Sequence, residues 1–127
     1  MRILVADDSC VVFERLVEML ASAPEAEIVG HTTDLPATLR SLAESCPDIV
    51  ILDLCMPGGT GMDVLKSIRE NGQETAAVVL TNFPYAQYRA RCRSLGAVAF
   101  LDKSMQFDQV LGVIQDLESQ RTPSVMR

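Results

Sequence analysis

The stretch DIVILD, residues 48–53, decides the fold of this chain. Its run of consecutive apolar residues is typical of a strand that is covered on both faces, and such strands lie at the centre of parallel sheets. A half-exposed strand would instead alternate apolar and polar residues. We therefore expect residues 48–52 to form a central parallel strand, with Asp53 at the point where this strand ends.

Outward from this strand, short apolar segments alternate with amphipathic ones, as they do in chains built from βαβ units. The expected strands are residues 2–6, 27–32, 48–52, 76–80 and 98–101. The expected helices begin after a cap at Asp8 or Ser9, near Leu35, near Met62, after Pro84 and near Gln106, and the last one ends near Ser119. This pattern predicts an α/β three-layer sandwich, a (βα)5 unit with a five-stranded parallel sheet. Right-handed crossovers favour the strand order 2-1-3-4-5.

The composition narrows the classes of function. The chain has 127 residues, of which 48% are hydrophobic, and a chain of this length can bury a core that needs no disulfide or structural metal. Its net charge of −6 and pI near 4.6 oppose nucleic-acid binding, because proteins that bind a phosphate backbone usually carry a basic face. The apolar segments are too short for a bilayer span or a secretory signal. We expect a cytoplasmic protein with neither a nucleic-acid nor a membrane partner.

The cysteines and the single histidine offer no second site. The thiols are scattered without CxxC spacing, so neither a zinc site nor a redox motif is predicted. A buried, reduced thiol is the expected state for each, although Cys55, two residues after Asp53, could line the mouth of a site. His31 is expected to be an ordinary loop or strand-end residue.

Polar side chains follow four of the expected strands. Asp7 and Asp8 come after the first, Asp53 after the third, Thr81 after the fourth and Lys103 just after the fifth. The carboxyl ends of parallel strands lie along one edge of a sheet, so these residues are expected to meet. Clustered carboxylates repel one another unless a cation is bound, and Mg²⁺ prefers oxygen ligands. A phosphoryl group would then meet the metal, the ammonium group and the hydroxyl together.

Each of these residues also has an ordinary structural role. The Asp7-Asp8 pair could cap a helix, and Asp53 could form a turn. Thr81 could cap the fourth helix, and Lys103 could extend into solvent. Their joint placement at four strand ends favours the common site over four separate roles.

The motifs VADDS, ILDLCMPGGTG, VVLTN and FLDKS, in this order, resemble the receiver domain of two-component response regulators, from residue 2 to about 119. The resemblance implies a flavodoxin-like fold and an aspartyl-phosphate site. In that site Asp53 is the phosphoacceptor, and Asp8 and Asp53 bind Mg²⁺ directly. Asp7 acts through metal-bound water, and the backbone carbonyl of Cys55 completes the protein ligands. Thr81 and Lys103 then receive the phosphoryl oxygens.

The resemblance also implies a switch. On phosphorylation Thr81 moves inward, and the aromatic residue of the fifth strand, here Phe100, follows it. Phe100 lacks the hydroxyl group of a tyrosine, so packing alone would govern its movement. Ser104 stands where a proline often follows the lysine, which makes a cis peptide bond after Lys103 less expected.

We therefore expect a stand-alone receiver domain, residues 1–120, with a short tail, residues 121–127, and no output domain. The resemblance implies that a sensor histidine kinase or a phosphotransfer protein supplies the phosphoryl group. A downstream target protein would read the altered surface, and a phosphorylation-dependent homodimer is one form that this signal could take. The chain would be no enzyme beyond promoting its own phosphorylation and dephosphorylation.

Three other interpretations stay open at the level of the sequence. A haloacid-dehalogenase-like phosphatase would also use an aspartate and Mg²⁺, but Asp53 is not followed two residues later by the second acid of that family. A phosphate-independent protein-binding module would be expected to lack the acceptor or the lysine. The chain could also be the receiver part of a truncated DNA-binding regulator.

Overall fold

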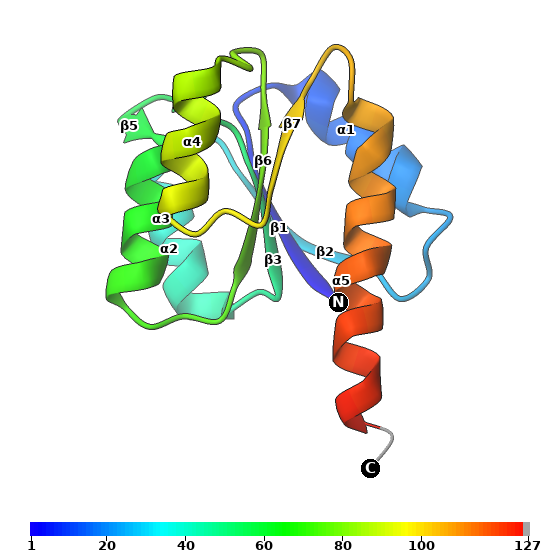
Figure 1. Cartoon of the computed structure of the whole chain (residues 1–127). Coiled ribbons are helices and arrows are strands. Elements are labelled where there is room, and N and C mark those ends of the chain that lie inside the picture. The colour runs from blue at the N-terminus through cyan, green and yellow to red at the C-terminus, as the bar shows by residue number, and fades with distance from the viewer. Residues whose placement is uncertain (126–127) are drawn as a thin grey trace.

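In the computed structural model, a parallel sheet lies between two layers of helices (Figure 1). The structure describes residues 1–125. The strands of the sheet are β1 (Arg2–Ala6), β2 (Glu27–Thr32), β3 (Ile49–Leu52), β6 (Ala76–Thr81) and β7 (Ala99–Asp102). The helices are α1 (Cys10–Leu20), α2 (Leu35–Ser45), α3 (Gly61–Glu70), α4 (Ala86–Ser94) and α5 (Val110–Val125), and a 3-10 helix, η1 (Phe107–Gln109), precedes α5.

The strand order is β2-β1-β3-β6-β7, and every neighbouring pair in this sheet is parallel. Because β6 and β7 are the fourth and fifth strands of the sheet, the predicted order 2-1-3-4-5 is confirmed. Figure 1 shows α1 and α5 on one face of the sheet and α2, α3 and α4 on the other. The α/β three-layer prediction is thereby also confirmed.

The central strand β3 contributes to the cores on both faces of the sheet. All of its residues are buried. Val50 and Leu52 pack in the cluster that includes side chains of α2 and α3, whereas Ile49 and Ile51 pack in the cluster that includes side chains of α1 and α5. This alternation is the consequence of the two-residue period of a strand.

Helix α1 begins at Cys10, directly after its N-cap residue. Of the two caps that the sequence allows, Ser9 is the one observed, and its Oγ accepts a hydrogen bond from the Val12 N–H at 3.2 Å. This cap satisfies one of the amide groups that a helix leaves open at its start. Asp7 and Asp8 therefore remain outside the helix, in the connection that follows β1.

The connection after β3 contains a small hairpin that the sequence pattern did not predict. Its strands, β4 (Cys55–Met56) and β5 (Gly59–Thr60), pair antiparallel. The hairpin packs against the start of α2, where the Leu35 N–H donates to the Pro57 carbonyl at 2.9 Å. Such short pairings are difficult to predict, because a long-range contact and not the local period of apolar residues stabilises them.

Two expectations were wrong. Helix α5 continues to Val125 instead of ending near Ser119, since no glycine or asparagine follows that position to end it. Residues 126–127 lie outside the described residues. Cys92 alone among the described thiols is buried. The other three are exposed because Cys10 opens α1, Cys46 follows α2, and Cys55 lies in the hairpin.

No helix within residues 1–125 combines the length and the apolar character that crossing a membrane requires. The described backbone also contains no cis peptide bond, so the bond between Lys103 and Ser104 is trans.

Candidate functional site

An acidic cluster lies at the carboxyl ends of β1 and β3. Asp7 and Asp8 follow β1 and Asp53 follows β3, and one carboxylate oxygen of each lies within 4.8 Å of the other two. Asp7 and Asp53 are buried, and Asp8 is exposed. The pairing of β1 with β3 continues up to the cluster, since the Asp53 N–H donates to the Ala6 carbonyl at 2.9 Å. The sheet register therefore brings together carboxylates that are far apart in the sequence.

Lys103 reaches this cluster from the end of β7. Its Nζ lies 2.7 Å from Asp7 Oδ2 and 3.2 Å from Asp53 Oδ2, and its side chain is only 8% exposed. The Lys103 N–H donates to the Thr81 carbonyl at 2.8 Å, which holds the start of the lysine against the end of β6. The alternative that Lys103 extends into solvent is wrong.

Burial has the largest effect on the pKa of Asp53 and raises it. The positive charge of Lys103 lowers this pKa, the negative charge of Asp7 raises it, and the Cys55 N–H, which donates to Asp53 Oδ1 at 3.3 Å, lowers it. The net effect is a pKa above the ordinary value of 3.8. Without a further cation, the folded protein therefore disfavours the ionised form of Asp53.

Lys103 shows the opposite balance. Burial by itself lowers the pKa of this ammonium group, but the hydrogen bond to Asp7 and the charges of Asp53 and Asp7 raise it, and the pKa lies above its ordinary value. Lys103 is therefore a fixed positive charge at neutral pH. It can partly neutralise the two buried carboxylates, but three carboxylates outnumber one ammonium group.

Thr81 and Cys55 complete the edge of the cluster. Thr81 ends β6 and is fully buried, and its Oγ1 accepts a hydrogen bond from the Phe83 N–H at 2.9 Å. Cys55 is exposed, and burial and the charge of Asp53 raise the pKa of its thiol. Metals bind the thiolate, and the raised pKa disfavours that form of Cys55.

Phe100 lies on β7, three residues before Lys103. Its ring is buried, and the Arg89 guanidinium of α4 covers it at 4.8 Å from the ring centroid. Arg89 Nη1 also donates to the Phe100 carbonyl at 3.1 Å. The aromatic residue of the last strand is therefore in contact with α4 by both its ring and its backbone.

Sequence reasoning missed two residues that shape the site. Gly61, the first residue of α3, packs so closely that a Cβ built on it would lie 2.6 Å from the Asp53 carbonyl oxygen. The glycine-rich loop LCMPGGTG was a signal for such a close approach. His31 of β2 places its Nε2 at 2.8 Å from the Asp7 carbonyl oxygen, and no local pattern indicated this contact.

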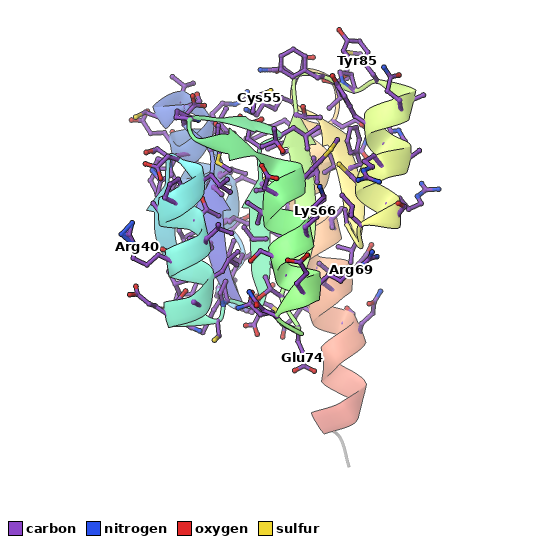
Figure 2. All side chains as sticks on the ribbon, turned by 90° about the vertical axis from the view of Figure 1, so that its left-hand side faces the viewer. Arg40, Cys55, Lys66, Arg69, Glu74 and Tyr85 are labelled. Atoms are coloured by element: carbon purple, nitrogen blue, oxygen red, sulfur yellow. The ribbon has the colours of Figure 1, made fainter. Side chains whose placement is uncertain are left out.

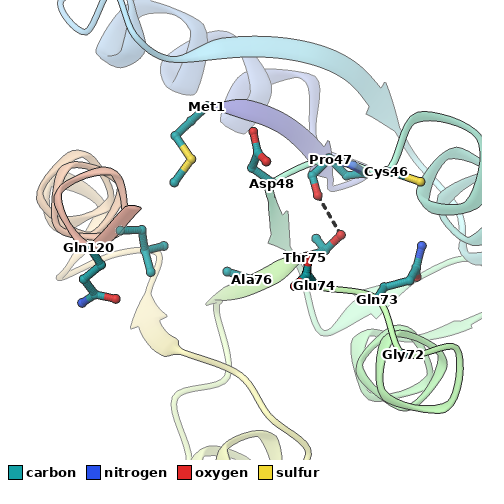
Figure 3. A pocket seen from close by; sticks show the side chains of 11 residues that line it. Met1, Cys46, Pro47, Asp48, Gly72, Gln73, Glu74, Thr75, Ala76 and Gln120 are labelled. Atoms are coloured by element: carbon teal, nitrogen blue, oxygen red, sulfur yellow. Dashed lines mark hydrogen bonds between the residues drawn. The ribbon is translucent and has the colours of Figure 1, made fainter. Parts of the chain in front are cut away.

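An open pocket of about 590 Å³ lies at the other end of the sheet (Figure 3). It is lined by residues that precede β1, β3 and β6, among them Thr75, whose Oγ1 donates to the Pro47 carbonyl at 2.7 Å. In Figure 2, Glu74 of this end and Cys55 of the acidic end lie at opposite ends of the molecule. The pocket therefore belongs to a different surface from the acidic cluster, at the amino ends of the strands.

Comparison with known proteins identifies the family. A family model described as the response regulator receiver domain matches residues 3–115. The receiver domain of the response regulator NarL from Mycobacterium tuberculosis superposes with a TM-score of 0.83 at 25% identity, over 92% of this chain and 95% of that one. The response regulator domain of Thermotoga maritima CheB gives a TM-score of 0.81 at 25% identity, over 94% of each chain.

Curated relatives are longer than this chain. A protein-glutamate methylesterase/protein-glutamine glutaminase of Geobacter sulfurreducens is 33% identical over 118 residues, which are 91% of this chain and 32% of that protein. The transcriptional regulatory protein LiaR of Bacillus subtilis is 27% identical over 90% of this chain and 54% of its own length. The chain thus spans only part of each of these relatives. The matched residues 3–115 contain the whole acidic cluster and all of the sheet except Arg2, the first residue of β1. The chain therefore belongs to the response regulator receiver domain family, whose members act as phosphoacceptors in two-component signalling.

Proposed function

We propose that Asp53 is the residue that accepts the phosphoryl group. The observation that carries this proposal is the placement of the Asp53 carboxylate, which is buried within a cluster of acids and lies 3.2 Å from Lys103 Nζ. Asp7 is held closely on both of its oxygens, at 2.8 Å by the Ser9 N–H and at 2.7 Å by Lys103. The corresponding contacts of Asp53, with the Cys55 N–H and with Lys103, are longer, at 3.3 and 3.2 Å. Asp8 is exposed and suited to a ligand role. Asp53 thus combines the nearby positive charge of Lys103 with longer hydrogen-bond contacts to the protein than those of Asp7.

The donor set of the cluster fits Mg²⁺. Asp8 and Asp53 would bind the ion directly, Asp7 would act through metal-bound water, and the Cys55 backbone carbonyl would add a further oxygen. These are hard oxygen donors of the kind that Mg²⁺ prefers. A divalent cation would also balance the excess of carboxylates over the single ammonium group and favour the ionised form of Asp53. When bound, Mg²⁺ would supply positive charge for the oxygens of the phosphoryl group.

The reaction that we propose is a phosphoryl transfer. An oxygen of the Asp53 carboxylate forms a bond to phosphorus, while the bond from phosphorus to the imidazole nitrogen of a phosphohistidine, or to the oxygen of a small acyl phosphate, breaks. The leaving group takes the electron pair of that bond. Lys103 and the Thr81 hydroxyl then contact the phosphoryl oxygens. Once a divalent cation favours the ionised form of Asp53, no proton has to leave this carboxylate during the transfer. The site then works by positioning and charge and needs no general base.

Phosphorylation of Asp53 would change the packing of β6, β7 and α4. Thr81 would turn toward the phosphoryl group, and Phe100 would move with it. Phe100 pairs with Val79 of the same strand as Thr81, and its ring lies against Arg89 of α4. The kinase or phosphotransfer protein that supplies the group, the downstream target and a phosphorylation-dependent homodimer are further parts of this proposal. The proposal also includes a cytoplasmic location and a receiver domain that comprises residues 1–120. The protein would promote only its own phosphorylation and dephosphorylation.

A receiver that forms part of a longer regulator is the second candidate, and one observation favours it. The chain spans 32% of the methylesterase relative and 54% of the LiaR relative. Expression of the complete genomic reading frame, followed by its intact mass, distinguishes the two candidates. A mass above 13.9 kDa would support the longer regulator.

The test of the acceptor is the intact mass of the protein after incubation with acetyl phosphate and Mg²⁺. We expect a gain of one phosphoryl group that requires the metal and disappears in Asp53→Asn. Asp48→Asn is the matched control, because Asp48 precedes the same strand at its opposite end. If no gain occurs and beryllofluoride also fails to bind, the phosphate-independent binding module becomes the better interpretation.

A further inference from the structure

His31 holds the peptide group that leads from Asp7 to Asp8. Its Nε2 lies 2.8 Å from the Asp7 carbonyl oxygen. A carbonyl oxygen only accepts hydrogen bonds, so Nε2 carries the hydrogen and donates it. On its other side, the Asp7 N–H donates to the Thr32 carbonyl at 3.0 Å. Strand β2 therefore binds both peptide groups that flank Asp7, one through its backbone and one through the His31 side chain.

The imidazole ring is itself held in place by α1. It stacks on the Phe13 ring with the centroids 4.0 Å apart and the ring planes 4° from parallel. The Phe13 N–H donates to the Ser9 carbonyl at 3.1 Å, in the first turn of α1. The orientation of the imidazole is thus set by a helix that begins immediately after the acidic pair.

The Asp7 carbonyl group belongs to the same planar peptide unit as the Asp8 nitrogen. Fixing this oxygen therefore fixes the direction in which the chain continues to the Asp8 Cα. Asp8 is exposed, in contrast to Asp7, so burial does not order its side chain. The His31 hydrogen bond is therefore a contact that can limit the positions open to Asp8 before a cation binds.

We propose that His31 is a positioning residue for the acidic pair and raises the affinity of the site for Mg²⁺ by fixing the peptide group between Asp7 and Asp8. This inference rests on the proposed magnesium site. Groups that orient metal ligands from outside the ligand set commonly raise metal affinity, because the ligands are then ordered before the ion binds. His31 differs from the usual case in that it binds the backbone of a ligand segment and not a ligand side chain.

Two substitutions separate the hydrogen bond from the ring. His31→Phe keeps a ring that can stack on Phe13 but removes the donor, whereas His31→Gln places an amide donor at nearly the reach of Nε2 and removes the ring. Ile28→Ala is the control for a loosened edge strand, since Ile28 packs on the core from β2 and pairs with Ile3, near the end of β1 that is remote from Asp7. The measurement is the Kd for Mg²⁺ at pH 8, from a titration followed by backbone amide NMR shifts.

We expect His31→Phe to bind Mg²⁺ about tenfold more weakly than the wild type, at the low end of the cost of losing such an outer contact. His31→Gln and Ile28→Ala should stay close to the wild-type affinity. His31→Met, which also lacks a donor, replaces the phenylalanine variant if that variant does not fold.

Wild-type affinity in His31→Phe would overturn the inference. An equally weak His31→Gln would overturn it as well, because the ring and not the donor would then matter. An equally weak Ile28→Ala would point to the edge strand in general and would have the same consequence. If the wild type itself binds no Mg²⁺, the proposed magnesium site fails instead, so the two failures can be told apart.

Discussion

At the scale of single residues, folding disfavours the ionised form of Asp53. It is 6% exposed, and burial raises its pKa above the ordinary value of 3.8 despite the nearby Lys103. Between the ordinary value and the raised one, the folded state binds more protons than the unfolded state. The free energy of unfolding therefore falls as the pH rises through this window.

Asp53→Asn should stabilise the metal-free protein at pH 7, because an amide of the same shape avoids the buried charge. We expect a gain above the ~0.5 kcal/mol that is usual for surface substitutions, together with a weaker loss of stability as the pH rises above 3.8. Urea denaturation over a pH series measures both. Asp8→Asn makes the same charge change at an exposed position and serves as the control. An Asp53→Asn protein that is less stable than the wild type at pH 7 would contradict this account.

Gly61 has a separate role in the same site. Its Cβ position lies 2.6 Å from the Asp53 carbonyl oxygen and 3.1 Å from the Leu54 Cα, and both of these are backbone atoms. Gly61→Ala should therefore displace the start of α3 or the Asp53 backbone. We expect a loss of about 1–3 kcal/mol, as for other overpacked positions, and slower phosphorylation by acetyl phosphate.

Gly112→Ala is the matched control for this prediction. Gly112 lies in α5, and nothing lies within 4 Å of its Cβ position. Alanine there should raise the free energy of unfolding by about 0.5–1 kcal/mol, since glycine is a poor helix former. Thermal denaturation and the rate of mass gain with acetyl phosphate distinguish the two glycines. Equal effects of both substitutions would show that the close contact to Asp53 is unimportant.

At the scale of elements, the turn after β7 orients Lys103 without a proline. Asp102 Oδ1 accepts hydrogen bonds from the Ser104 N–H at 2.9 Å and the Ser104 hydroxyl at 2.8 Å. The Gln106 side chain accepts from the Asp102 N–H at 3.0 Å, and the Gln106 N–H donates to the Asp102 carbonyl at 2.8 Å. These bonds close the turn around Lys103. They also favour ionised Asp102, and the hydrogen bonds from Ser104 are the largest cause of its lowered pKa.

Asp102→Ala removes the hydrogen bonds from Ser104 that close the turn around Lys103. The Lys103 side chain would then be less well oriented toward Asp53, and we expect phosphorylation of the protein to be several-fold slower. The rate of mass gain with acetyl phosphate measures this effect. Asp102→Asn retains the acceptor oxygen and should remain closer to the wild type. Since the pKa of Asp102 is lowered, the contribution of its charge is present above the ordinary value of 3.8 and is lost as the pH falls through the folded value. A wild-type rate in Asp102→Ala would show that the turn does not orient Lys103.

Strand β7 and helix α4 are two further elements whose packing the site can influence. Phe100 contacts Arg89 through both its ring and its carbonyl oxygen. If phosphorylation draws Thr81 inward, the Phe100 ring has to repack, and its NMR resonances should shift when beryllofluoride and Mg²⁺ are added. Phe107 is a matched control, because its ring lies against Arg15 in the other layer and should shift less. Unchanged Phe100 resonances would contradict the proposed switch.

At the scale of the whole molecule, only the folded chain can assemble the acidic cluster. Asp8 and Asp53 belong to different strand ends and lie together because β1 pairs with β3. An ion that binds this cluster therefore binds the folded state and not the unfolded one. By mass action, Mg²⁺ at one hundred times its Kd should stabilise the protein by about 2.7 kcal/mol.

The melting temperature should accordingly rise with the Mg²⁺ concentration at constant ionic strength. Asp8→Asn should remove most of this dependence, and because Asp8 is exposed the substitution should leave the fold intact. Calorimetry of both proteins with and without Mg²⁺ provides the measurement. The same Mg²⁺ dependence in Asp8→Asn would place the ion somewhere other than the acidic cluster.

Much of this architecture could be predicted because local patterns carry it. The apolar run of residues 49–52 forms a strand buried on both faces, and Ser9 caps α1 as one of the two expected residues. The β4–β5 hairpin and the extension of α5 to Val125 were missed. The hairpin depends on contacts with α2, and the sequence holds no signal that ends α5 where it was expected to end.

The alternation of strands and helices could be deduced from the amino-acid order alone. This alternation places Asp7, Asp8, Asp53, Thr81 and Lys103 at or just after strand ends that share one edge of a parallel sheet. Apolar periodicity and capping act between residues close in the chain, so they can be read directly from its order. Three contacts became visible only in the folded molecule. Lys103 joins Asp7 to Asp53, Gly61 packs against the Asp53 backbone, and His31 holds the peptide group before Asp8. These contacts require the separations between different elements to be correct to within a few tenths of an ångström. Such separations follow from the packing of the complete sheet and its helices.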